Sequence, residues 1–263
     1  MKAAEAEPDP ALRRAAGFVA MSGDPLRGRA AAALVGERPL AEAIEAFEAR
    51  QRGDGAFVAS EEPSPLAATL AILGLLDDLG ALNQPLVERA CAQLARIQRD
   101  DGSWSDGDAV AETAALVTTG TLAGILAKTR WVRPRVLAAA GDFLAKRWSP
   151  DRVQRFDWRA LAAHAQFFSN ADHELADEAL QWCGRELERG YRQGRFDAIR
   201  IARVFAYCDA RALPGARIEA RELAAAIRTA QVEDGGWPAP GDDPSVSRVV
   251  HSFDALVALG RLA

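Results

Sequence analysis

Apolar residues recur along most of the chain at the spacing of three and four that is typical of amphipathic helices. Segments 40–50 and 86–97 carry apolar side chains on one side and charged side chains on the other. Segments 65–79 and 109–127 are apolar nearly all round. The first kind predicts outer, solvent-facing helices, and the second predicts inner helices that are buried between neighbours. Alternating β-branched stretches are scarce, so the sequence predicts an all-α protein.

A seven-residue motif, Q-x-x-D-G-x-W, recurs between these helices. It is complete at 98–104 and 231–237, and Phe replaces Trp at 51–57. The three copies start 98 − 51 = 47 and 231 − 98 = 133 residues apart, and a third of the longer spacing is about 44, the size of a repeat unit. Two weakened units are therefore expected between the last two copies, ending at the Arg-Phe-Asp triplets 155–157 and 195–197. Such a period indicates repeats that stack on their neighbours.

The motif has a mechanical interpretation. Its Gln ends one helix, Asp-Gly reverses the chain, and the aromatic ring fixes the turn against a neighbour. These residues are predicted to be scaffold rather than catalytic. A further helix pair is predicted at 11–18 and 26–35, so that residues 9–263 form one domain of about five to six helix-turn-helix repeats, with residues 1–8 as a flexible tail.

Composition narrows the classes of protein. The net charge of −5 and pI near 5.4 argue against a nucleic-acid partner, which would require a basic face. No apolar run is long enough to span a bilayer, and the first eight residues lack the pattern of a signal peptide, so a cytoplasmic protein is expected. The three cysteines, Cys91, Cys183 and Cys208, form no C-x-x-C pair, which favours reduced thiols over disulfides or a zinc cage.

The repeats resemble those of the squalene–hopene cyclase and protein prenyltransferase β-subunit superfamily over residues 38–263. The resemblance rests on the Q-x-x-D-G-x-W copies and on inner helices that contain Glu-Thr-Ala-Ala-Leu at 112–116 and Ser-Phe-Asp-Ala-Leu at 252–256. It implies an α/α toroid, with outer and inner rings of helices, whose hollow binds an isoprenoid. The same toroid also resembles thioester-containing complement domains, but their Gly-Cys-Gly-Glu-Gln motif does not occur in this sequence.

The catalytic motifs of that superfamily are incomplete in this chain. Cyclases of class II protonate an alkene with the middle Asp of Asp-x-Asp-Asp, where this sequence has Ala111, and only the following Glu112 is acidic. His251 resembles the zinc-binding His of protein prenyltransferases, yet the accompanying Asp-x-Cys does not occur. Asp77 and Asp78 lack the third carboxylate of a magnesium motif. No metal or cofactor is therefore expected, and Glu112 is retained as a candidate acid.

Polar side chains lie along one face of three predicted inner helices. A cavity that binds only a hydrocarbon chain would instead be lined by apolar side chains. They are Asp157 and His164 in the fourth unit, Asp197, Arg200, Arg203 and Tyr207 in the fifth, and Arg248, His251 and Asp254 in the sixth. Buried charges are costly unless they are paired, so these stripes require partners, water or a ligand.

Two interpretations of the stripes remain open. In the first, Asp197–Arg200 and His251–Asp254 are structural pairs that fix helix packing. In the second, Arg200, Arg203 and Arg248 hold an anionic head group such as a diphosphate, and His251 serves as a general acid or base oriented by Asp254. Tyr207, His164, Asp157, Asp197 and Trp158 would then complete the substrate-binding wall.

The leading hypothesis is a terpene cyclase-like or prenyltransferase-like protein that binds an isoprenoid in the central cavity and cyclises, rearranges or transfers it. The alternative is a non-catalytic α/α toroid that binds a lipid, a peptide or a protein. A third hypothesis, an α/α-barrel carbohydrate enzyme, requires a pair of carboxylates across the cavity. Substrate, product and oligomeric state are left open by the sequence.

Overall fold

The computed structural model describes residues 9–60, 62–107, 111–151, 158–241, 243 and 246–262. This part of the chain contains twelve α-helices and no strand, which confirms the all-α prediction. The helices are α1 (Pro10–Ala20), α2 (Pro25–Leu34), α3 (Leu40–Glu48), α4 (Pro65–Asp78), α5 (Pro85–Ile97), α6 (Glu112–Ala127), α7 (Pro134–Ala145), α9 (Trp158–Asn170), α10 (Ala176–Arg192), α11 (Ala198–Tyr207), α12 (Ala220–Thr229) and α13 (Arg248–Leu262). The tail predicted for residues 1–8 lies outside the described residues.

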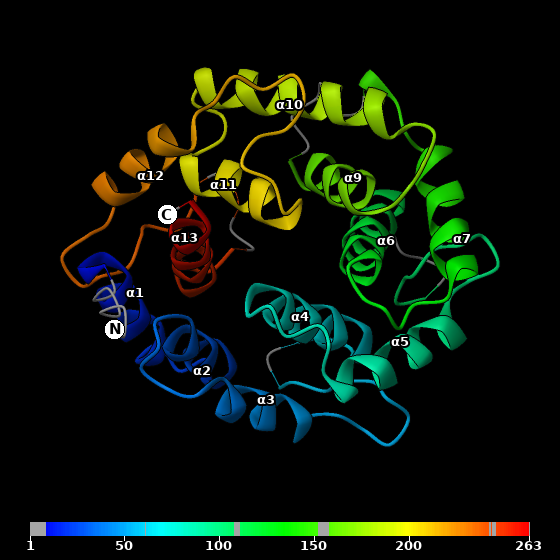
Figure 1. Ribbon diagram of the computed structural model, residues 1–263, viewed down its shortest axis with the longest axis horizontal. Coiled ribbons are helices and arrows are strands. Elements are labelled where there is room, and N and C mark those ends of the chain that lie inside the picture. The colour runs from blue at the N-terminus through cyan, green and yellow to red at the C-terminus, as the bar shows by residue number, and fades with distance from the viewer. Residues whose placement is uncertain are drawn as a thin grey trace, which may run out of the picture.

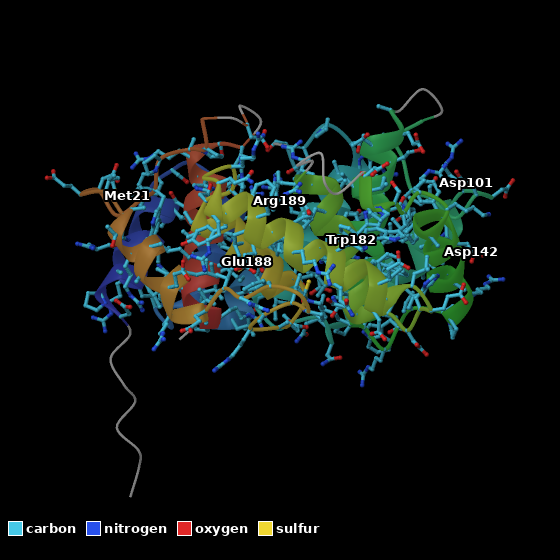
Figure 2. All side chains as sticks on the ribbon, turned by 90° about the horizontal axis from the view of Figure 1, so that it is seen from above. Met21, Asp101, Asp142, Trp182, Glu188 and Arg189 are labelled. Carbon is cyan, nitrogen blue, oxygen red and sulfur yellow. The ribbon has the colours of Figure 1, made fainter. Side chains whose placement is uncertain are left out.

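The helices alternate between the periphery and the interior of the molecule (Figure 1). Helices α3, α5, α7, α10 and α12 lie outside, whereas α4, α6, α9, α11 and α13 lie within them. Figure 2 shows α10 across the front of the molecule, with Trp182, Glu188 and Arg189 on it. The peripheral α5 and α10 each have one strongly polar face, while the interior α4 and α6 are apolar nearly all round. The distribution of apolar residues around each helix therefore agrees with its place at the periphery or in the interior.

Each motif turn ties one outer helix to the next, as the second copy shows. The side-chain amide of Gln98 donates to its own turn, at the carbonyl of Gly102 (3.0 Å), and to the start of α7 (2.9 Å). Gly102 has a φ of +87°, and a Cβ there would lie 2.0 Å from the carbonyl oxygen of Ala139, so glycine is required. The indole N–H of the fully buried Trp104 donates to the carbonyl of Leu94 at 2.9 Å. These contacts give the motif the structural role in the turn that its sequence predicts.

The last copy of the motif binds the first helix, so the two ends of the described chain meet (Figure 1). The side-chain amide of Gln231 donates to the carbonyl of Ala11 at 2.9 Å, and its oxygen accepts from Arg14 at 2.7 Å. Arg228, on α12, forms an ion pair with Asp9 at 3.0 Å. Gln51 and Gln98 make the same side-chain bond to the outer helix that follows each of them. Helix α1 therefore takes the place of a following outer helix for the last turn.

The described residues share one continuous hydrophobic core. The three cysteines are buried free thiols, in agreement with the expectation from their number and spacing. Burial raises the pKa of Cys91 to about 11 and that of Cys208 to about 12, so these thiols are protonated and unreactive at neutral pH. Within the described residues, no helix combines the length and the apolar character that crossing a membrane requires.

Candidate functional site

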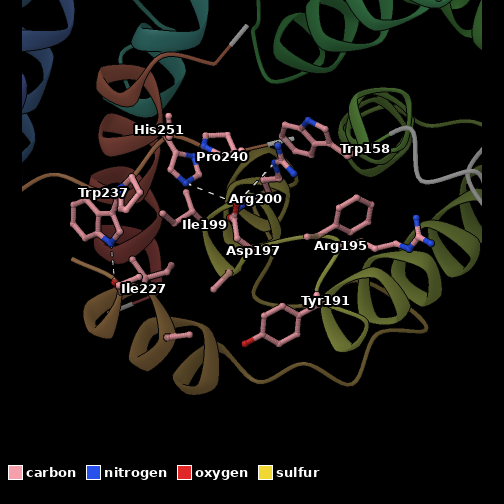
Figure 3. A pocket seen from close by; sticks show the side chains of 18 residues that line it. Trp158, Tyr191, Arg195, Asp197, Ile199, Arg200, Ile227, Trp237, Pro240 and His251 are labelled. Carbon is pink, nitrogen blue, oxygen red and sulfur yellow. Dashed lines mark hydrogen bonds and ion pairs between the residues drawn. The ribbon is translucent and has the colours of Figure 1, made fainter. Parts of the chain in front are cut away.

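A cavity of about 710 Å³ opens between the first turns of α9, α11 and α13 and the outer helices α10 and α12 (Figure 3). We call it the large cavity. Its volume falls within the range of roughly 300–1,000 Å³ that is typical of small-molecule sites. Four residues that the sequence singled out line it: Trp158, Asp197, Arg200 and His251. Its other lining residues include Tyr191, Arg195, Phe196, Ile199, Ile227, Trp237, Pro238 and Pro240.

Asp197 organises the polar end of the large cavity. It is the N-cap of α11, where its side chain accepts from the backbone N–H of Arg200 at 2.8 Å. Its Oδ2 atom lies 3.9 Å from Nε of Arg200 and 3.8 Å from Nε2 of His251. The guanidinium of Arg200 lies over the ring of Trp158, 5.6 Å from its centroid. The carboxylate of Asp197 therefore lies within 4 Å of both the buried guanidinium of Arg200 and the buried imidazole of His251, at the N-terminus of α11.

The rest of the large cavity is mainly apolar. Ile199, Ile227 and Pro240 form part of its wall, and Figure 3 shows Tyr191 and Arg195 away from His251, toward α10. Sequence reasoning missed Tyr191 and Pro240 as site residues. Arg195 carried a signal, because it begins the Arg-Phe-Asp triplet 195–197, in which only Asp197 was a candidate site residue.

A second, smaller cavity of about 190 Å³ lies among the inner helices α2, α4, α6, α11 and α13, and we call it the central cavity. The buried Arg203 dominates its wall and binds both oxygens of Asp78 on α4, at 2.7 and 3.1 Å. Its Nε lies 2.9 Å from Oδ1 of Asp254 on α13, and it donates to the hydroxyl of Tyr207 at 3.2 Å. We call these four residues the Arg203 cluster.

The charges of the Arg203 cluster support one another. Burial works against the charge on Arg203, but the neighbouring Asp78, Tyr207 and Asp254 outweigh it and hold the pKa of the guanidinium well above its usual value. Burial raises the pKa of Asp254, and the nearby Arg203 opposes that rise. Burial likewise raises the pKa of Tyr207 to about 12, so its hydroxyl stays protonated. At neutral pH the cluster is thus a paired structural group rather than a set of open donors.

The three arginines that the sequence predicts to hold one anionic head group therefore lie in three different places. Arg200 lines the large cavity and Arg203 lines the central cavity. Arg248 binds both oxygens of Asp234 in the last motif turn, at 2.8 and 2.7 Å, and lies over the ring of Phe18. Hydrogen bonding to Arg248 lowers the pKa of Asp234. Of the three arginines, only Arg200 lines the same cavity as His251.

The remaining candidates lie apart from this group. His251 and Asp254 do not form the expected pair, because Asp254 contacts Arg203 and the carboxylate nearest to His251 is that of Asp197. Glu112 is exposed at the first position of α6 and forms an ion pair with Arg147 at 3.2 Å. His164 is fully buried, with Nδ1 2.8 Å from a backbone carbonyl and its ring stacked on an aromatic neighbour. The prediction for Asp157 falls outside the described residues.

Across the parts of the chain that the structure describes, no three His, Cys, Asp or Glu side chains gather in a group that could hold a metal ion. Comparisons with models of protein families, with curated proteins and with solved structures found no match.

Proposed function

We propose that the chain is an α/α toroid of the cyclase and prenyltransferase type, and that it binds an isoprenoid with an anionic head group, such as a prenyl diphosphate, in the large cavity. Three features support the toroid: the alternation of outer and inner helices, the motif turns that tie successive outer helices, and the bonds between the last turn and α1. The observation that carries the proposed ligand is the meeting of Arg200, His251 and Trp158 in a cavity whose other lining residues are mostly apolar, with Asp197, Arg195 and Tyr191 as further polar ones.

The polar end of the large cavity suits an anionic head group. Arg200 supplies a guanidinium at the first turn of α11, and guanidinium groups match the geometry of phosphate oxygens. The backbone amides that begin α11 add a favourable partial charge beside it. His251, 3.8 Å from Asp197, can supply a second donor when it is protonated.

The apolar walls suit a hydrocarbon chain. Trp158, Ile199 and Ile227 come from three different helices and face the same space. Covering apolar surface with a ligand contributes roughly 25 cal/mol per Å² removed from water, so even a short prenyl chain would gain several kcal/mol from this wall. An amphiphile with its head at Arg200 and its chain along α12 uses both ends of the cavity.

The large cavity also holds a group suited to proton transfer. The imidazole of His251 lies beside a carboxylate, an arrangement that orients a general acid or base. If the protein rearranges or transfers its isoprenoid, His251 is the residue that we assign to moving the proton. Non-catalytic binding is the second candidate function, and it is favoured by the pairing of Asp254 with Arg203, which leaves this carboxylate engaged in an ion pair.

Replacing Arg200 with alanine is expected to weaken the binding of farnesyl diphosphate at least tenfold, since the head group loses its guanidinium partner. Calorimetric titration measures the dissociation constant. The matched control is Arg38→Ala, because Arg38 is an exposed arginine that pairs only with Glu42 at 3.3 Å in the described contacts, and its loss should leave the affinity unchanged.

Equal affinity of the Arg200→Ala variant and the unaltered protein would contradict the proposed head-group site. The two candidate functions separate in an assay for products formed from farnesyl diphosphate. An enzyme of this kind forms a product that His251→Ala abolishes while binding persists. A binding module returns the ligand unchanged.

A further inference from the structure

Asp197 places a negative charge beside the two groups that would bind the proposed head group. Its Oδ2 atom lies 3.8 Å from Nε2 of His251 and 3.9 Å from Nε of Arg200 (Figure 3). A hydrogen bond from an N–H group to a ligand oxygen is about 2.9 Å long, so an oxygen bound at Nε2 lies at most about 3.8 + 2.9 = 6.7 Å from this carboxylate. That distance is shorter than the screening length of roughly 8 Å at physiological salt. A bound anion therefore experiences the charge of Asp197.

The described polar side chains at this end of the large cavity supply little net positive charge. Arg200 contributes one positive charge and Asp197 one negative charge, and the imidazole of His251 adds at most one positive charge, so the sum lies between zero and plus one. The side chains of Arg200 and His251 are 5% and 7% exposed, so water screens a charge beside them only weakly. Arg195 also lines the cavity, but it lies toward α10, away from His251 (Figure 3).

The next layer of side chains along the same two helices adds no net positive charge. Arg203 on α11 and Asp254 on α13 each lie three residues beyond the groups at the polar end, which corresponds to about 4.5 Å of rise. The single guanidinium of Arg203 faces two carboxylates, that of Asp78 at 2.7 Å and that of Asp254 at 2.9 Å. The Arg203 cluster therefore does not compensate an anion in the large cavity.

Head groups differ in the charge that they bring to this end of the cavity. A carboxylate carries one negative charge near neutral pH. A diphosphate carries about three, because both of its phosphates are ionised. Arg200 and His251 can balance one negative charge. The additional charges of a diphosphate would face the carboxylate of Asp197 with no further cation of the described polar end to balance them, and this repulsion grows in proportion to the charge of the ligand.

We propose that the large cavity prefers an isoprenoid whose head group carries a single negative charge, such as a carboxylate, over a diphosphate, and that Asp197 sets this preference. The inference rests on the proposed function and narrows its class of ligand. Asp197 is the carboxylate partner of two buried groups, Arg200 and His251, and the same negative charge limits the charge that a ligand can bring to them.

The affinities for two ligands with similar chains provide the first test. Farnesoic acid carries a carboxylate on a chain like that of farnesyl diphosphate. Calorimetric titration at pH 8 and constant ionic strength measures the dissociation constants of both ligands. The unaltered protein is expected to bind farnesoic acid more tightly than farnesyl diphosphate. The reverse order would overturn the inference.

The variant Asp197→Asn provides the second test. Asparagine is as good an N-cap as aspartate, so the variant keeps the start of α11 and removes the charge. The affinity for farnesyl diphosphate is expected to rise at least tenfold. Because the repulsion is proportional to the charge of the ligand, a tenfold gain for about three charges corresponds to a gain of about twofold for the single charge of farnesoic acid. Equal gains for the two ligands would show that Asp197 does not select by charge.

Asp24→Asn is the matched control. Asp24 is the N-cap of α2, and it accepts the backbone N–H of Arg27 at 3.0 Å and forms an ion pair with that arginine. Asp197 and Arg200 have the same spacing at the start of α11. Asp24 lines a different, smaller pocket, so its replacement is expected to leave the ratio of the two affinities unchanged. A change as large as that of Asp197→Asn would assign the preference to the net charge of the protein and overturn the role of Asp197.

The outcomes separate this inference from the proposed function. If neither ligand binds the unaltered protein, the proposed function is wrong and the inference fails with it. If Arg200→Ala weakens the binding of both ligands but Asp197→Asn leaves their ratio within twofold of the unaltered value, only the inference is wrong. Circular dichroism confirms that Asp197→Asn is folded. Should it fail to fold, the order of the two affinities in the unaltered protein decides.

Discussion

Replacing Arg203 with alanine is expected to lower the free energy of unfolding by roughly 3–5 kcal/mol, because it leaves the carboxylates of Asp78 and Asp254 buried without their partner. Arg203 is 4% exposed and is the residue that joins these two carboxylates, at 2.7 and 2.9 Å. Urea denaturation followed by circular dichroism measures the change as a shift of the midpoint at constant slope. The loss is a large fraction of the stability of a typical domain, roughly 5–15 kcal/mol.

Two controls isolate the buried charges as the cause. The variant Asp78→Asn, Arg203→Met, Asp254→Asn removes all three charges at similar volume, and buried ion pairs replaced in this way often leave stability nearly unchanged. Arg38→Ala breaks an ion pair between side chains that are 67% and 49% exposed, so a change of less than about 1 kcal/mol is expected. A loss of under about 1 kcal/mol in Arg203→Ala itself would contradict the structural role of the cluster.

Replacing Trp104 with alanine is expected to cost about 3–5 kcal/mol of folding free energy, the usual cost of removing a fully buried aromatic side chain. Trp104 is 0% exposed, and its indole N–H donates to Leu94 on α5. It lies in the motif turn that ties α5 to α7, so its loss leaves a void at a junction between repeats. Denaturant titration measures this change as well.

Trp104→Phe is the informative companion of that variant. At the matching position of the first copy, Phe57 is also 0% exposed, and its backbone N–H donates to Thr69 at 3.0 Å, as that of Trp104 donates to Thr119. A phenyl ring therefore fits this kind of turn. The expected cost is about 1–2 kcal/mol, for one lost hydrogen bond and a small void. Equal costs for the Phe and Ala variants would show that the ring's volume is not what fixes the turn.

The turns could be predicted from the sequence because their geometry is local. A Gly with positive φ, an Asp that caps the turn and a buried ring lie within seven residues, so their spacing alone indicates the structure. The assignment of 86–97 to an outer helix and of 109–127 to an inner one followed from the distribution of polar residues. Segment 109–127 corresponds to α6, which begins at Glu112.

The partners of the polar stripes could not be predicted, because they come from distant parts of the chain. Helical periodicity places Arg200 and Arg203 on one face of α11. They lie about one helical turn apart, however, and each lines a different cavity. Asp78, which binds Arg203, lies 125 residues away in the sequence and was considered only as part of a metal motif. The rotation and height of each helix in the packed layers decide such pairings. The sequence could not predict the surroundings of Glu112 either, because its exposure depends on where the start of α6 lies in the packed molecule.

A crystal structure of the protein with farnesyl diphosphate tests the central claim most directly. The proposed site predicts density for the ligand in the large cavity, with the diphosphate within hydrogen-bonding distance of Arg200 and His251 and the chain along Ile199 and Ile227. Density in the central cavity beside Asp254, or an empty large cavity at a ligand concentration well above the measured dissociation constant, would contradict the proposed function.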